Sequence, residues 1–122
     1  MKNLLIVIFG SGIGGGFRYA TSLLVKQFFP SIFPLGTFLV NILGCLLIGM
    51  VLGATIRTTN DTNELKLLLA TGFCGGFTTF SAFASENLEM MRNGNHITAL
   101  MYIILSVVIG ILSTFIGSYI FK

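Results

Sequence analysis

The stretch TGFCGGFTTFSAFASE, residues 71–86, decides the fold of this chain. It lies inside an apolar run long enough to cross a bilayer, yet it contains three glycines, three threonines, two serines, four phenylalanines and a carboxylate. A helix that contacts only lipid would be rich in Leu, Ile and Val. The composition therefore predicts a membrane span that is interrupted and that presents polar and aromatic groups to an ion.

The rest of the chain is equally apolar. Of its 122 residues, 54% are hydrophobic and 9% are charged, whereas soluble domains average about 25% charged residues. The apolar residues form four runs, each close to or above the roughly 20 residues that span a hydrocarbon core as a helix. The sequence predicts an all-α membrane protein, one domain of residues 1–122 with spans at about 4–25, 32–56, 65–91 and 97–121.

The basic residues are scattered, mostly near the ends of the runs, which argues against nucleic-acid binding and suits interfacial anchors. With the N-terminus inside, the inner side would carry Lys2, Arg57, Lys66 and Lys122, and the outer side Lys26 and Arg92. So weak a bias in positive charge permits insertion in both orientations, and a chain of dual topology can pair with an inverted copy of itself.

Glycines weaken the third span at one place. Gly72, Gly75 and Gly76 lower helix propensity within about one turn. A helix broken in lipid survives only where its freed backbone groups find partners inside the protein. Freed carbonyls can coordinate a cation, and Thr78 and Thr79 add hydroxyl groups beside the predicted break.

Aromatic residues follow the glycines. Phe77, Phe80 and Phe83 recur every three residues, so we expect them to share one helix face. Because the edge of an aromatic ring is electropositive, such a face can contact an anion. Glu86 ends the stretch, and the sequence leaves three roles open: carrying protons, accepting hydrogen bonds from local donors, or pairing with Arg18.

Polar residues in the other spans each have two interpretations. Arg18 either extends its side chain to the interface or forms an electropositive element at a pore mouth. Asn41 either hydrogen-bonds a neighbouring helix or lines a pore. Tyr102 and Ser106 lie four residues apart and so share a face of the fourth span, with Gly110 continuing the line.

Small residues within the spans are expected to serve packing. Glycine pairs at positions 12/16 and 49/53 are predicted to let helix backbones approach closely. Cys45 and Cys74 both fall within predicted spans, where we expect small buried side chains rather than a disulfide.

Three segments together resemble the Fluc fluoride channels, also called the CrcB family: GGGFRY at 14–19, PLGTFLVNILG at 34–44 and GFCGGFTTFSAFASE at 72–86. The resemblance covers essentially the whole chain. It implies a four-helix subunit with a broken third helix, assembled as an antiparallel, dual-topology dimer in the cell membrane. The implied function is passive, fluoride-specific conduction that lowers cytoplasmic fluoride, with a second inverted copy or a paralogous subunit as partner.

The resemblance also implies roles for single residues. Backbone carbonyls of Gly75 and Thr78 would hold a structural sodium ion at the dimer centre. The ring edges of Phe80 and Phe83 would meet fluoride. The further implied positions are Asn41 as an amide donor, Tyr102 and Ser106 on the polar side of the fourth helix, and Arg18, Thr79 and Glu86 in the vestibule or along the polar track.

Other functions make different predictions. A proton-coupled exporter of fluoride or small molecules would need a titrating carboxylate such as Glu86; small multidrug exporters also carry an acid in the first span and tryptophan, whereas this chain has no acid before Asp61 and no Trp. A non-transporting scaffold would tolerate Phe80→Ile and Phe83→Ile. No nucleophile–base pair or metal-ligand set is visible, which argues against a membrane enzyme.

Overall fold

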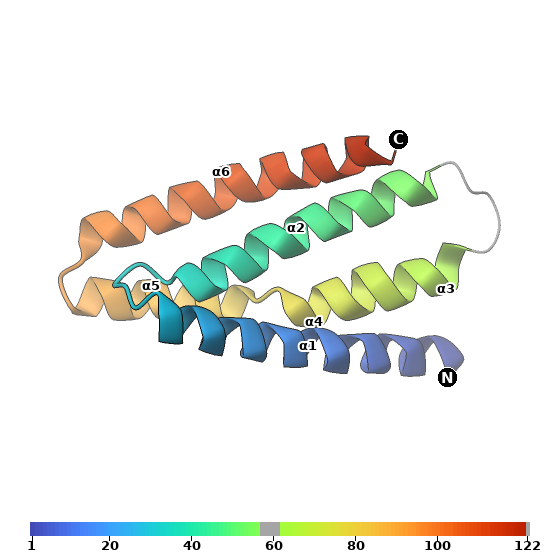
Figure 1. The fold of residues 1–122 in the computed structure, drawn as a ribbon, viewed down its shortest axis with the longest axis horizontal. Coiled ribbons are helices and arrows are strands. Elements are labelled where there is room, and N and C mark those ends of the chain that lie inside the picture. The colour runs from blue at the N-terminus through green and yellow to red at the C-terminus, as the bar shows by residue number, and fades with distance from the viewer. Residues whose placement is uncertain (57–61, 122) are drawn as a thin grey trace.

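The structure, a computed structural model, describes residues 1–56 and 62–121, with only the backbone of residues 62 and 63. Long helices lie side by side in it (Figure 1). One segment, η1, has wide helical turns of the i→i+5 type. In chain order the elements are α1 Lys2–Phe28, α2 Leu35–Thr55, α3 Thr62–Lys66, η1 Leu67–Cys74, α4 Gly75–Phe77, α5 Phe80–Arg92 and α6 His96–Ile120.

Within the described residues, four helical stretches are long and apolar enough to cross a membrane: Lys2–Phe28, Leu35–Thr55, Glu64–Arg92 and His96–Ile120. The predicted all-helical, four-span architecture is therefore confirmed. Both ends of the chain lie at the same end of the bundle (Figure 1). Two of the cations used to predict orientation, Arg57 and Lys122, lie outside the described residues.

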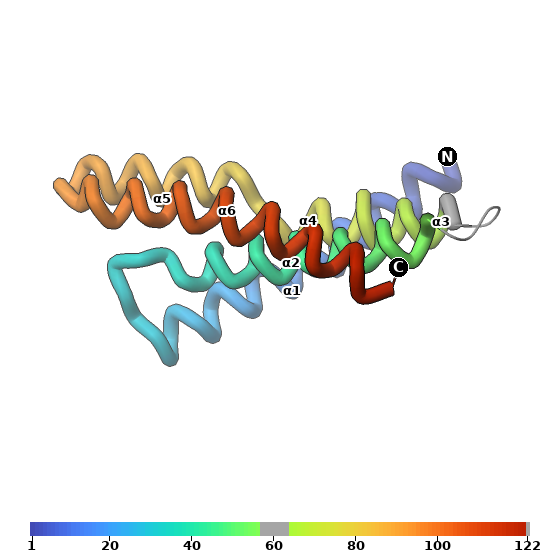
Figure 2. Tube along the Cα trace, turned by 90° about the horizontal axis from the view of Figure 1, so that it is seen from above, coloured from blue at the N-terminus to red at the C-terminus, as the bar shows by residue number. Residues whose placement is uncertain are grey.

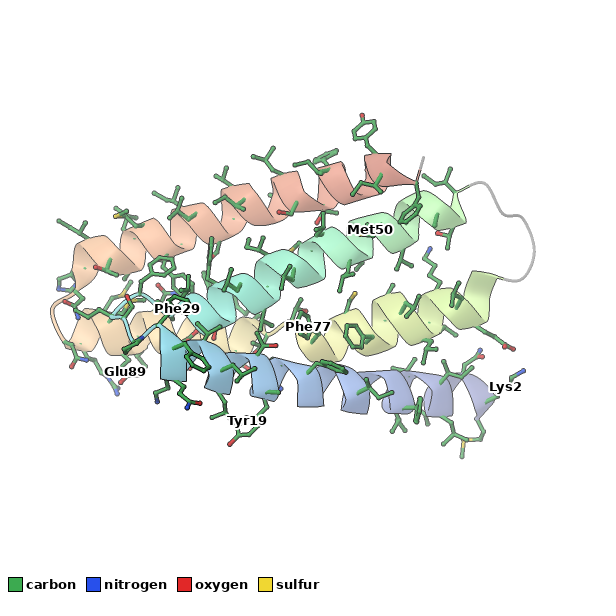
Figure 3. All side chains as sticks on the ribbon, in the orientation of Figure 1. Lys2, Tyr19, Phe29, Met50, Phe77 and Glu89 are labelled. Atoms are coloured by element: carbon green, nitrogen blue, oxygen red, sulfur yellow. The ribbon has the colours of Figure 1, made fainter. Side chains whose placement is uncertain are left out.

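Apolar side chains cover the outside of the bundle. Along α6, Ile104, Ile111, Phe115 and Ile116 are each at least half exposed, and in Figure 3 many side chains of this helix point away from the other helices. A soluble monomer rarely exposes so continuous an apolar surface. This surface suits contact with lipid.

The helices pack in two close pairs, α2 along α6 and α1 along η1 and α4. In the first pair, a Cβ atom at Gly49 would lie 2.9 Å from the carbonyl carbon of Thr114, and one at Gly53 would lie 3.0 Å from that of Ser118. From the other side, a Cβ at Gly117 would lie 2.9 Å from the amide nitrogen of Met50. Because the two backbones touch, the predicted packing role of the 49/53 pair is confirmed.

The second close pair uses different glycines from those predicted. A Cβ at Gly10 would lie 2.6 Å from a carbonyl oxygen of η1, and one at Gly14 would lie 2.8 Å from the amide nitrogen of Phe77. Apart from the adjacent residues and backbone of α1 itself, no atom of the described residues lies within 4 Å of a Cβ built at Gly12 or at Gly16. The 12/16 prediction was therefore wrong for contacts within the subunit, because two residues along a helix turn a side chain by about 200° to the other face.

These two glycine faces give a matched stability test. Gly14→Ala is expected to destabilise the protein by about 1–3 kcal/mol, because the added methyl group meets rigid backbone. Gly12→Ala should be neutral or slightly stabilising, since alanine favours the helix by up to about 1 kcal/mol and nothing lies within 4 Å of the added Cβ. Unfolding free energies of the two variants in the same detergent check this, and equal values would contradict the assigned packing face.

Candidate functional site

Two residues with an extended backbone, Thr78 and Thr79, separate α4 from α5 and are called the interruption below. α4 ends at Phe77, Thr78 has an extended backbone at φ −83° and ψ 159°, and Thr79 follows at φ −152° and ψ 117°. α5 then begins at Phe80. The predicted position of the break at Gly72, Gly75 and Gly76 was wrong, because these glycines remain helical in η1 and α4 and the extended residues come only after Phe77.

Hydrogen bonds satisfy the backbone at this interruption. The amide nitrogen and Oγ1 of Thr78 donate to the carbonyl of Cys74 at 3.0 and 2.7 Å, which closes the end of α4. Thr79 Oγ1 accepts from the amide of Ala82 at 3.1 Å and caps α5. Asn41 on α2 donates from Nδ2 to the Thr79 carbonyl at 3.2 Å, and its Oδ1 accepts from the Thr79 amide at 2.8 Å.

Asn41 thus hydrogen-bonds a neighbouring helix, which is one of its two predicted roles. It pairs with both the amide and the carbonyl of Thr79. The other predicted role stays open, because Asn41 also lines a cavity at the interruption. Its Nδ2 carries two hydrogens, and the Thr79 carbonyl takes one of them.

Arg18 on α1 forms a hydrogen bond with the third span beside the interruption. Its Nε donates to the carbonyl of Gly76 at 3.2 Å, and the side chain is partly buried. This carbonyl lies in the last turn before the interruption, where helical carbonyls lose their usual partners. Among the described residues Arg18 forms no ion pair with Glu86, whose two carboxylate oxygens accept hydrogen bonds from other residues.

Glu86 accepts two hydroxyl hydrogen bonds. Thr37 Oγ1 donates to Oε2 at 2.9 Å, and the Tyr102 hydroxyl donates to Oε1 at 3.0 Å. This matches the second of the three roles left open, acceptance from local donors. Thr37 is buried, and its part in the site was not predicted. The available signal was its spacing, one turn before Asn41 on the same face of α2.

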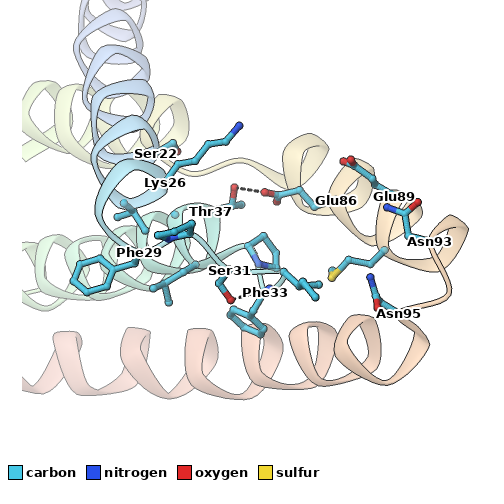
Figure 4. Close-up of a pocket in the computed structure, with 17 residues that line it drawn as sticks. Ser22, Lys26, Phe29, Ser31, Phe33, Thr37, Glu86, Glu89, Asn93 and Asn95 are labelled. Atoms are coloured by element: carbon cyan, nitrogen blue, oxygen red, sulfur yellow. Dashed lines mark hydrogen bonds between the residues drawn. The ribbon is translucent and has the colours of Figure 1, made fainter.

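A first cavity, the mouth cavity, has a volume of about 440 Å³ and lies between the end of α1, the α1–α2 connection and the end of α5. Viewed from above, α5 and the first part of α6 lie apart from that connection (Figure 2). Figure 4 shows Lys26, Glu89 and Asn93 around the cavity and the bond from Thr37 to Glu86. Solvent-side polar groups therefore lead to the Glu86 carboxylate.

A second cavity, the break cavity, also has a volume of about 440 Å³ and lies at the interruption. Tyr102 connects the two: its hydroxyl bonds Glu86 at the mouth cavity, and its ring centroid lies 4.9 Å from that of Phe83 at the break cavity. The structure brings most of the predicted site residues to the break cavity, namely Asn41, Gly75, Thr78, Thr79, Phe80, Phe83 and Ser106.

The three phenylalanines do not form one continuous face. Phe80 is 79% exposed and its ring centroid lies 5.7 Å from that of Phe83. Phe77 is buried and stacks on Phe73 at 5.5 Å. The shared-face prediction was wrong for Phe77, because the extended residues after it change the direction in which the later side chains point.

Ser106 offers an unused polar group. Its Oγ is buried, and among the described residues it has no hydrogen-bond partner. Tyr102, one turn earlier on α6, has its hydroxyl satisfied by Glu86. Gly110, one turn later, packs against the Cys45 sulfur, which would lie 3.5 Å from an added Cβ. Because a buried hydroxyl normally has a partner, Ser106 is a candidate donor to a bound ion.

A four-span protein with an interrupted span, polar groups buried beside it and a cavity at that point has the features of a membrane transport protein. Residues 5–118 match the family described as CrcB-like protein, Camphor Resistance (CrcB), and the chain belongs to this family.

Similar proteins cover the whole chain. A relative from Flavobacterium psychrophilum is 40% identical over 122 residues, 100% of this chain and 98% of the relative. One from Phocaeicola vulgatus is 44% identical over 117 residues, 96% of each chain. One from Gloeothece citriformis is 43% identical over 122 residues, 100% of this chain and 98% of the relative. All three are named fluoride-specific ion channel FluC, so the family is one of channels and not of enzymes.

Proposed function

We propose that this chain forms a passive, fluoride-specific channel in the plasma membrane that lets fluoride leave the cytoplasm. The observation that carries the proposal is the break cavity, where an amide and two aromatic rings meet a buried hydroxyl that has no partner among the described residues. The names of relatives that match this chain along its whole length support fluoride as the ion.

The chemistry of a small anion fits these groups. Fluoride leaves water only if donors in the protein replace its hydration shell. The Ser106 hydroxyl and the second hydrogen of Asn41 Nδ2 are such donors, and the edges of Phe80 and Phe83 add a weaker positive potential. Glu86 positions Phe83 indirectly, because its hydrogen bond to the Tyr102 hydroxyl holds the ring that packs on Phe83.

The fluoride gradient across the membrane drives this flow, without coupling to a second ion. Hydrogen fluoride is a weak acid that crosses the membrane and ionises in the more alkaline cytoplasm, where fluoride then accumulates. A passive channel releases the accumulated anion without coupling to another ion.

The working unit of the proposal is an antiparallel dimer with a broken third helix in each subunit. Phe80 is 79% exposed within a single chain, although its ring faces the proposed ion path. A second, inverted copy of the chain would cover this face, and the weak charge bias of the sequence allows the inversion. A paralogous subunit of opposite orientation is the alternative partner.

A structural sodium ion fits the carbonyls of Gly75 and Thr78. The usual helical partner of the Gly75 carbonyl is the Thr79 amide, and this amide donates to Asn41 instead. Thr78 is extended, so its carbonyl also lies outside the helical pattern. Such freed carbonyl oxygens suit a hard cation, and an inverted copy would supply the same two again. When bound, sodium would supply a fixed positive charge that joins the two interruptions.

A fluoride electrode tests the function directly. Liposomes that contain only the purified chain and are loaded with potassium fluoride are expected to release fluoride when valinomycin carries the balancing potassium. Liposomes loaded with potassium chloride should release no chloride under the same conditions. Absence of fluoride release from correctly inserted protein would contradict a self-sufficient channel, and equal chloride release would contradict specificity.

Replacing Glu86 separates a channel from a proton-coupled exporter. Glu86→Gln keeps one acceptor oxygen but cannot carry a proton as a carboxylate does, so passive efflux should persist within about tenfold, the effect of one weakened hydrogen bond. A pH dye inside the liposomes should report no proton movement coupled to efflux in either protein. Glu89→Gln, at the same mouth cavity, is the control. Proton exchange that stops in Glu86→Gln alone would favour the exporter.

A further inference from the structure

Two cysteines line the break cavity from different helices. Cys45 lies on α2 and Cys74 is the last residue of η1, and both line the cavity. They are the two cysteines of the chain, and both are free. Cys74 is 3% exposed and Cys45 is partly buried.

The two cysteines flank one contact between α2 and the third span. A Cβ at Gly44 would lie 3.6 Å from the Cβ of Thr78, so α2 touches the third span at this residue. Cys45 follows Gly44 directly. Thr78 Oγ1 bonds the carbonyl of Cys74 at 2.7 Å, which places Cys74 one turn before the same contact.

The Cys45 sulfur packs against Gly110, but neither sulfur atom takes part in a hydrogen bond within the described part of the chain. The hydrogen bonds to these residues go to their backbone carbonyls, from Thr114 to Cys45 at 3.2 Å and from Thr78 to Cys74. Neither sulfur has a hydrogen-bond partner among the described residues. The neighbouring polar groups at the cavity are hydroxyls and an amide, which are hard ligands.

We propose that Cys45 and Cys74 form a two-thiolate site for one soft cation of the Cu(I) class. Soft monovalent d¹⁰ ions prefer thiolates over oxygen ligands and are satisfied by two sulfur ligands, whereas Zn²⁺ takes four. Each thiol releases one proton as its metal–sulfur bond forms, so two protons leave for each cation bound. The bound cation would lie beside Phe80 and Ser106 and obstruct the proposed fluoride path, a consequence that rests on the proposed function.

Silver is a redox-stable probe of this site. Purified protein in chloride-free detergent buffer is titrated with silver nitrate, and the thiols that remain free are counted with a fluorescent maleimide. We expect one silver ion per chain to protect both thiols. Cys45→Ser and Cys74→Ser should each weaken silver binding at least about 100-fold, because the second ligand no longer acts within the same molecule. Cys45→Ala and Cys74→Ala repeat the test should a serine variant fail to elute as the folded protein.

The stoichiometry decides the proposal. Independent binding of two silver ions per chain, or single variants that bind as tightly as the original protein, would overturn it. Fluoride efflux with silver, expressed relative to the same protein without silver, should fall in the original chain and stay constant in the double variant. Absence of fluoride efflux from any protein would contradict the proposed function and leave the titration result standing.

Discussion

Replacing Phe83 by isoleucine is expected to reduce fluoride efflux to the rate of protein-free liposomes. Isoleucine preserves the apolar contact but has no ring, so it lacks the electropositive edge that the proposed path requires. Phe83 lines the break cavity, and its ring centroid lies 4.9 Å from that of Tyr102. Electrode traces and size-exclusion profiles of the same preparation measure flux and assembly together.

Phe38 provides the matched control for this substitution. Its ring also packs on Tyr102, at a centroid distance of 6.5 Å, but it lines neither the mouth cavity nor the break cavity. Phe38→Ile should therefore lose similar packing and retain efflux. Unchanged efflux in Phe83→Ile would support the non-transporting scaffold, whereas equal losses in both variants would show that packing on Tyr102 matters and the cavity-facing ring does not.

Asn41→Leu is expected to abolish efflux and to lower the free energy of unfolding by about 1–3 kcal/mol, the cost of leaving a buried backbone group unsatisfied. Leucine has a similar volume but bonds neither the amide nor the carbonyl of Thr79, both of which Asn41 holds. In a membrane these groups have no water to replace the lost partner. Unfolding in detergent and efflux from liposomes measure the two effects.

Two further variants separate the bonds of Asn41 from general destabilisation. Asn41→Asp keeps an acceptor for the Thr79 amide and loses the donor to the Thr79 carbonyl. Its free energy of unfolding should therefore lie between that of the original protein and that of Asn41→Leu. Asn3→Leu changes an exposed amide at the start of α1 and should leave both measurements unaltered. Stability of Asn41→Leu equal to that of the original protein would contradict the structural role of the pair.

The sequence was sufficient for the membrane spans and for the packing role of Gly49 and Gly53, whereas α6 as their partner came from the structure. Span length and hydropathy follow from composition, and Gly49 and Gly53 lie four residues apart, so they share one face of their helix. The first span carries a run of glycines from Gly10 to Gly16, so spacing alone did not tell which pair faces η1. Only the packing of the third span on α1 selected Gly10 and Gly14.

The site was predictable in its residues more than in its contacts. Polar types in an apolar run identified Asn41, Glu86 and Tyr102, because buried polar side chains in lipid need partners. Which partners they take depends on how helices far apart in sequence are aligned. The bonds of Asn41 to Thr79 and of Thr37 to Glu86 join residues 38 and 49 positions apart, a relation that periodicity within one span does not contain.

The two extended residues have an electrostatic consequence. They place the carboxyl end of η1–α4 next to the amino end of α5, so the negative pole of one helix dipole meets the positive pole of another, each equivalent to roughly half an elementary charge. The negative pole lies where Arg18 bonds and where sodium is proposed, and the positive pole lies at the first turn of α5, which carries Phe80 and Phe83. One interruption of two residues can therefore attract ions of opposite sign on its two sides.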